Sequence, residues 1–103
     1  MIITNTDKKK FRAIGHKLKP IVMIAQKGLS ENIGAELNRA LEAHELIKIK
    51  IAAGERDEKK TLTTEICKEF KAECIHSVGN IVLLYRASKR QDPKLSNLKR
   101  RLV

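Results

Sequence analysis

Isoleucine and lysine alternate in the middle of the chain, at Ile47, Lys48, Ile49, Lys50 and Ile51. This alternation narrows the choice of fold more than any other feature of the sequence. Successive side chains of a β-strand point to opposite faces of its sheet, so the pattern predicts a strand with one apolar and one basic face. The isoleucine face must pack on a core, and the lysine face is expected to meet water. The chain is therefore expected to hold a sheet that is covered by helices mainly on one side.

Periodicity and turn residues predict the other elements in the order helix, strand, helix, strand, helix, strand, strand. They are a helix from about Thr6 to Gly15, a buried strand at 21–25, a helix after the N-cap Ser30, the strand at 45–52, a helix that begins within 53–60, and strands at 74–78 and 81–86. Gly79-Asn80 joins the last two strands, and glycine in the first loop position suits a type II′ hairpin turn.

The fold class follows from this order. Strand–helix–strand units favour parallel neighbours, whereas a terminal hairpin must be antiparallel. We therefore expect an α/β fold, an α+β two-layer sandwich with a four-stranded mixed sheet. Residues 1–90 are expected to form a single domain, and residues 91–103 a basic, mobile tail.

Net charge gives the main functional signal. The chain of 103 residues carries +10, from 22 basic and 12 acidic residues. Residues 1–19 hold six Lys or Arg and one acid, and residues 86–103 hold seven and one, whereas the middle is nearly neutral. Charge gathered at both ends indicates a polyanionic partner, through Coulomb attraction and counterion release. The alternative is a surface that only keeps the protein soluble.

Motifs for catalysis and for metal binding are absent from the sequence. Cys67 and Cys74 form no C-x-x-C, and the histidine of HEL at 44–46 lacks the second histidine of H-E-x-x-H. Neither G-x-S-x-G nor a P-loop occurs. We expect no enzyme activity, metal, cofactor or small-molecule substrate.

The sequence also predicts where the protein works. No run approaches the roughly 18 apolar residues of a membrane helix, and the start, MIITNTDKKK, has no signal-peptide core. We expect a cytoplasmic monomer without a membrane partner, whose two thiols stay reduced.

The strand-to-helix corner at residues 25–28 has the chemistry of a phosphate contact. Gly28 lets a backbone approach without a Cβ in the way, and Lys27 adds a mobile charge. Free N–H groups at the start of the next helix favour an anion. The alternative is an ordinary turn with an exposed lysine.

Three stretches together resemble the CRM domain, the RNA-binding module of chloroplast splicing and ribosome maturation factors. They are LKPIVMIAQKGLSENI, ALEAHELIKIKI and VGNIVLLYR. The resemblance covers about residues 8–88 and is closest to the stand-alone bacterial members, the YhbY family. It implies a fold like the C-terminal domain of translation initiation factor three, with sheet order 1-2-4-3 and the fourth strand antiparallel to the rest.

The same resemblance implies a G-x-x-G loop, likened to the loop with which KH domains hold an RNA backbone. Here it falls on residues 25–28, where Ala25 replaces the first glycine. The implied partner is ribosomal RNA in a precursor of the large ribosomal subunit, which makes the protein an assembly factor. The candidate RNA-binding residues are Lys17, Lys19, Gln26, Lys27, Gly28, Lys48, Lys50, Arg86, Lys89 and Arg90.

Aromatic residues make up only 3% of the chain, so base stacking is not expected to be the main mode of binding. Contacts to the backbone of structured RNA are expected instead, with little sequence readout. Two other functions stay open: a protein-interaction module that docks on ribosomal proteins, and a general nucleic-acid chaperone or DNA binder.

The charge distribution predicts how salt acts on binding. If about five Lys or Arg side chains engage phosphates, the logarithm of the association constant should fall against that of the salt concentration with a slope of about −3.5 to −4.5. Titrations of a fluorescent structured RNA from low to moderate salt measure this slope. A slope close to zero would remove the electrostatic account.

Overall fold

In the described part of the chain, four strands pair into one mixed sheet in the order β1-β2-β4-β3. β1 (Pro20–Ile24) runs parallel to β2 (Leu46–Ile51). β4 (Ile81–Tyr85) is antiparallel to both of its neighbours, β2 and β3 (Glu73–Val78). The predicted fold class, strand order and antiparallel fourth strand are therefore confirmed.

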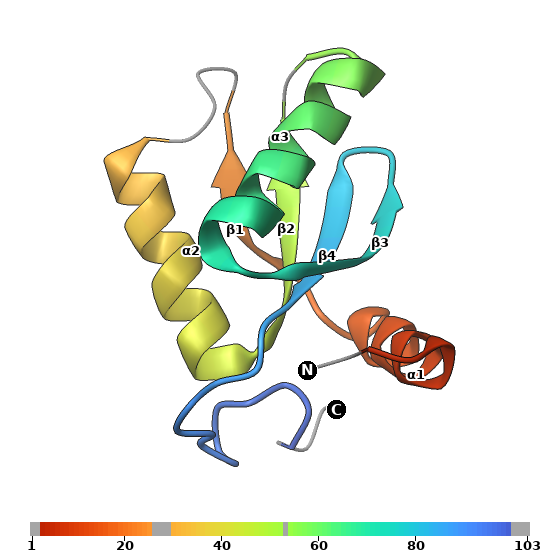
Figure 1. Ribbon diagram of the computed structural model, residues 1–103, viewed down its shortest axis with the longest axis vertical. Coiled ribbons are helices and arrows are strands. Elements are labelled where there is room, and N and C mark those ends of the chain that lie inside the picture. Colours follow the sequence, from red (N-terminus) through yellow and green to blue (C-terminus); the bar gives the residue numbers. More distant parts are fainter. Residues whose placement is uncertain (1–2, 26–29, 53, 100–103) are drawn as a thin grey trace.

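The computed structural model describes residues 3–25, 30–52 and 54–99. Within these ranges, three helices cover the sheet unequally (Figure 1). α2 (Glu31–His44) and α3 (Arg56–Phe70) pack on one face, whereas α1 (Asn5–Gly15) packs on the opposite face. None of these helices, within the described ranges, is long and apolar enough to cross a bilayer.

The main core lies between the sheet and the two helices α2 and α3. Ile47, Ile49 and Ile51 of β2 are buried there to 1% exposure or less, as their alternation predicted. Their partners include Leu37 and Leu41 of α2, Ile66 of α3, Val22 and Ile24 of β1, and Val82 and Leu84 of β4. Burial of so many aliphatic side chains, each stabilising by roughly 1.5–3 kcal/mol, holds this layer together.

Local capping sets where the first two helices begin. Thr4 precedes α1 and its hydroxyl accepts a hydrogen bond from the Asp7 N–H, while the Asp7 carboxylate accepts one from the Thr4 N–H. This reciprocal pair starts the helix slightly earlier than the predicted Thr6. Ser30 caps α2 as predicted, because its hydroxyl accepts from the Ile33 N–H at 3.2 Å.

α1 forms a second, smaller core on the other face of the sheet. The helix ends at Gly15, where an added Cβ would lie only 2.7 Å from the Leu83 side chain, so α1 rests directly on β4. The Phe11 and Tyr85 rings lie 4.8 Å apart between their centroids. Leu46 of β2 is buried in the same cluster. α1 thus covers the end of this face where β2 begins and β4 ends.

The C-terminal segment differs from the expected mobile tail. Ser96 and Asn97 are buried, and the Asn97 side-chain amide donates to the Leu46 carbonyl oxygen at 2.6 Å. The Asn97 N–H donates to the His44 carbonyl oxygen at 2.9 Å. These bonds hold the segment around Asn97 against the junction of α2 and β2, although the sequence predicted a mobile tail from residue 91. Residues 100–103 lie outside the described part.

Glu45 is the residue that anchors this segment. It takes φ 61°, a strained conformation for a non-glycine residue, and is only 3% exposed. Its carboxylate accepts from the Ser88 N–H at 2.9 Å, the Ser96 hydroxyl at 2.8 Å and the Gln91 side-chain amide. Burial alone would raise the pKa of Glu45, but these hydrogen bonds and the charge of Lys99 outweigh burial and lower it below 4.5.

Replacing Glu45 with glutamine should therefore lower the free energy of unfolding at pH 7 by about 2 kcal/mol, because charge-assisted hydrogen bonds are lost. A folded-state pKa below the unfolded value stabilises the protein above pH 4.5, and this stabilisation is lost as the pH falls through the folded pKa. The difference between wild type and Glu45→Gln should therefore shrink on acidification. Urea unfolding over a pH series measures it.

The matched control is Glu36→Gln, because Glu36 lies exposed on α2. It should change stability by less than about 0.5 kcal/mol at any pH. Equal stability of Glu45→Gln and wild type at pH 7 would contradict the anchoring role.

Candidate nucleic-acid interface

The sheet face opposite α2 and α3 is left uncovered beyond α1. We call its solvent-facing part the open sheet face, which consists of Ile21, Met23, Lys48, Lys50, His76, Val78 and Ile81. One cross-strand row runs Met23, Lys50, Ile81, Val78 through all four strands. Met23 and Val78 at its two ends are 58% and 60% exposed.

Lys48 and Lys50 project from the middle of this face, as the alternation predicted. Both are partly buried, which indicates aliphatic stems that lie along the sheet beneath charged tips. Among the described residues neither lysine forms an ion pair. Their charges are therefore free to meet an external anion.

The connection between α1 and β1 brings two more predicted residues to the same region. Lys17 and Lys19 are exposed. Lys19 directly precedes Pro20, and the backbone position of Pro20 pairs with Lys48. The structure thus places the α1–β1 connection beside the open sheet face.

The predicted loop contacts Gln26, Lys27 and Gly28 lie outside the described residues, and they stay predictions. The described neighbours on either side of them are Ala25, after β1, and Ser30, before α2. Ile24 pairs with Ile51, so β1 ends beside the end of β2 that carries Lys50.

Arg86 lies on the other side of the sheet, away from Lys48 and Lys50. Its guanidinium donates to the Asn38 side-chain oxygen at 2.9 Å, the Asn38 carbonyl oxygen at 3.1 Å and the Phe70 carbonyl oxygen at 3.3 Å. It also pairs with the Glu42 carboxylate at 3.3 Å, and its side chain is 17% exposed. The structure therefore gives Arg86 a role in joining α2 to the end of α3.

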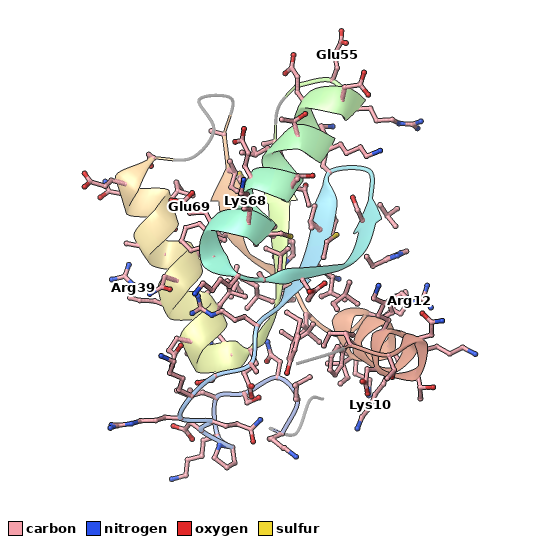
Figure 2. The ribbon with its side chains drawn as sticks, in the orientation of Figure 1. Lys10, Arg12, Arg39, Glu55, Lys68 and Glu69 are labelled. Carbon is pink, nitrogen blue, oxygen red and sulfur yellow. The ribbon has the colours of Figure 1, made fainter. Side chains whose placement is uncertain are left out.

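Lys89 and Arg90 are exposed on the segment that follows β4. β1 is parallel to β2, whereas β4 is antiparallel to β2. The last residues of β4 therefore lie at the same end of the strands as the first residues of β1, and these strand ends form one edge of the sheet. α1 precedes β1, so both basic terminal segments attach to this edge (Figure 1). Figure 2 shows Lys10 and Arg12 extending outward from α1 there. The predicted residues are thus divided between the open sheet face, this edge and the helix side.

The exposure of β1 differs from expectation. The apolar run at 21–25 predicts a buried strand, yet the side chains of Ile21 and Met23 are 50% and 58% exposed. β1 is an edge strand, and α1 packs on residues of β2, β3 and β4 rather than on β1, so only Val22 and Ile24 of β1 reach a core. This exposure cannot be predicted from the sequence, because a continuous apolar run looks the same whether helices cover one face of the strand or both.

Thiols and histidines show no reactive arrangement. Burial raises the pKa of Cys67 to about 11, and burial also raises that of Cys74, so both thiols stay protonated at neutral pH. The His44 ring nitrogen Nδ1 lies 2.7 Å from the Leu95 carbonyl oxygen, a structural contact. Within the described ranges no group of three or more His, Cys, Asp or Glu could hold a metal ion.

Comparison with known proteins gives a consistent result. The family model described as CRS1 / YhbY (CRM) domain matches residues 3–86. A probable RNA-binding protein of Pseudomonas aeruginosa is 43% identical over 100 residues, which is 97% of this chain and 96% of that protein. An RNA-binding protein of Haemophilus influenzae is 39% identical over 90 residues, 86% of this chain and 91% of its own length.

A solved structure agrees with the fold. The solution structure of a Staphylococcus aureus protein superposes with a TM-score of 0.77 at 28% sequence identity. The match covers 88% of this chain and 95% of that one.

The placement of Arg86 leads to a prediction about stability. Arg86→Met keeps most of the aliphatic stem but removes the bonds to Asn38 and Phe70, and should lower the free energy of unfolding by about 2 kcal/mol. The half-exposed pair with Glu42 adds little to this. Lys89→Met, an exposed change in the same segment, is the control and should be nearly neutral. Urea unfolding measures the stability of both variants. An Arg86→Met protein that keeps full stability but loses RNA affinity would contradict the joining role and place Arg86 in the RNA interface.

Proposed function

The chain belongs to the CRS1/YhbY (CRM) domain family, and on this premise we propose that it is an RNA-binding protein that contacts the RNA backbone with its open sheet face. The names of its relatives from Pseudomonas aeruginosa and Haemophilus influenzae support the partner class. The proposal concerns which surface is used and how.

The observation that carries the proposal is the pair Lys48 and Lys50 on an uncovered sheet. Residues two apart on a strand lie about 7 Å from each other and point the same way. Neither lysine has an acidic partner among the described residues, and Lys19 enters the sheet beside them. A row of unpaired charges on a rigid strand offers preorganised contacts to successive phosphates.

The mode of recognition follows from what this face lacks. Of the described aromatic residues, Phe11 and Tyr85 pack on each other under α1, and Phe70 packs against the main core. The open sheet face therefore presents mainly aliphatic and basic side chains, and the exposed imidazole of His76 is the one ring among the residues that define it. Such a surface suits the phosphates and 2′-hydroxyls of structured RNA better than stacking on single-stranded bases.

We further propose that the RNA is ribosomal RNA in precursors of the large ribosomal subunit, and that the protein acts as a cytoplasmic, monomeric assembly factor. The resemblance to stand-alone CRM proteins supports this biological setting. An assembly factor must bind reversibly, and contacts to backbone charge are readily tuned by ionic conditions.

One observation favours a second candidate function. Ile21, Met23 and Val78 expose more apolar surface on this face than phosphate binding needs. Apolar side chains exposed at both edge strands of one sheet face can mark a protein contact. Docking on a ribosomal protein is therefore the alternative, and ribonuclease treatment separates the two. Co-purification with large-subunit precursors that survives complete RNA digestion would favour protein contacts.

The double change Lys48→Gln and Lys50→Gln tests the surface. Loss of two phosphate contacts should reduce the steepness of the salt dependence by about 1.4–1.8 units and weaken binding to all structured RNAs. The matched control, Lys68→Gln with Lys71→Gln, removes two exposed charges at the end of α3. Fluorescence anisotropy titrations measure both variants; equal affinities for them would move the contact elsewhere.

A further inference from the structure

A basic hollow lies on the helix side of the sheet, between α3 and the β3–β4 hairpin. Its volume is about 730 Å³. Its inner wall is formed by Ile51, Cys74 and Val82. Its rim consists of Arg56, Lys59, Lys60, Thr63, Thr64, Ser77, Gly79 and Asn80. The hollow therefore combines an apolar interior with a polar, positively charged mouth, and we call it the hairpin cleft.

α3 is divided by charge, and its basic side faces the hairpin cleft. Arg56, Lys59 and Lys60 repeat at helical spacing along that side. The acids Asp57, Glu58 and Glu65 line a separate hollow of about 350 Å³, which the same helical spacing places on the opposite side of α3. None of the described residues that line the cleft is acidic. In Figure 2, nitrogen-tipped side chains extend from the first turns of α3 toward the side of the hairpin.

The three cations of the hairpin cleft have no acidic partner in the described part of the chain. The Lys59 ammonium donates to the side-chain oxygen of Asn80, a neutral group in the hairpin turn. Neither Arg56 nor Lys60 forms an ion pair there. Three uncompensated positive charges around one hollow make a site for an anion.

Hydroxyl groups on the rim complement the other part of a nucleotide. The Thr63 hydroxyl donates to the Lys59 carbonyl oxygen at 2.8 Å, and the Thr64 hydroxyl to that of Lys60 at 3.0 Å. Because their hydrogens are used, these oxygens can accept but not donate. They suit ribose hydroxyls, which donate, whereas the phosphate must be held by the cations.

We propose that the hairpin cleft holds a phosphate-bearing nucleotide of the bound RNA, with the phosphate at Arg56, Lys59 and Lys60 and the sugar or base against Ile51 and Val82. The volume lies within the range of roughly 300–1,000 Å³ that is typical of ligand pockets. The inference rests on the proposed RNA-binding function and adds a second contact on the opposite side of the sheet.

The hairpin turn joins the two contact surfaces. Lys50 and Ile81 of the open sheet face pair directly beside the turn, and the Ile51 N–H donates to the Asn80 carbonyl oxygen at 2.8 Å. Gly79 takes φ 57° in this turn, and nothing lies within 4 Å of the position where its Cβ would be. An RNA strand that crosses the turn therefore meets no side chain at Gly79 as it passes from one face to the other.

A triple variant tests the cleft: Arg56→Gln, Lys59→Gln and Lys60→Gln. It should weaken binding of the same structured RNA on the order of 10- to 100-fold at about 0.1 M salt and flatten the salt slope by about two units. The matched control removes three charges from the same side of the sheet outside the cleft: Arg39→Gln, Lys68→Gln and Lys71→Gln. Equal affinity of the two triple variants would overturn the inference alone. A wild-type protein that binds no RNA would overturn the proposed function and this inference with it.

NMR on the wild-type protein tests the cleft without any substitution. The amide signals of Thr63, Ser77 and Gly79 are followed during separate titrations with an RNA oligonucleotide, AMP and inorganic phosphate. We expect the oligonucleotide to shift these signals at the lowest concentration, because its other phosphates bind elsewhere on the same protein. Signals that stay unchanged at saturating RNA would overturn the cleft. AMP that shifts them at lower concentration than the oligonucleotide would overturn the assignment to RNA and identify a free nucleotide as the ligand.

Discussion

Burial of every second residue of β2 determines which surface of this protein is left for a partner. Ile47, Ile49 and Ile51 are buried under α2 and α3, and the pleat of the strand then directs Lys48 and Lys50 to the other face. A shift of one residue in the register would place both lysine charges in the core, at a cost of several kcal/mol each. Because β2 lies between β1 and β4, the same burial also fixes the rows of residues that surround the lysines.

A buried carboxylate performs the corresponding task at the other end of the sheet. Glu45 holds Ser88 and Ser96, while Arg86 joins α2 to the end of α3. These contacts fix the direction in which the chain leaves β4. Together with α1 they bring the two basic terminal segments, which are distant in sequence, to one edge of the sheet (Figure 1). The fold thus separates a charged edge from a flat basic face.

The sequence predicts well what depends on local periodicity and poorly what depends on distant partners. The strands, the helices and the Ile/Lys faces follow from spacing, and the strand order follows from the CRM resemblance. The anchoring role of Glu45 could not be predicted, because its partners Ser88 and Ser96 lie 43 and 51 residues away in the sequence. The position of Arg86 could have been predicted from the sequence. If the alternation of β4 continues past Tyr85, Arg86 lies on the same side as Leu84, which is part of the main core.

The central claim is that RNA lies on the open sheet face rather than along the terminal segments. A photoreactive amino acid placed at Met23 or at Leu95 tests it directly, because the two side chains are 58% and 45% exposed and neither is needed in a core. Irradiation of cells, followed by sequencing of the attached RNA, compares the two positions. The account predicts crosslinks to ribosomal RNA of large-subunit precursors from position 23 and few from position 95. Crosslinks from position 95 alone would contradict it.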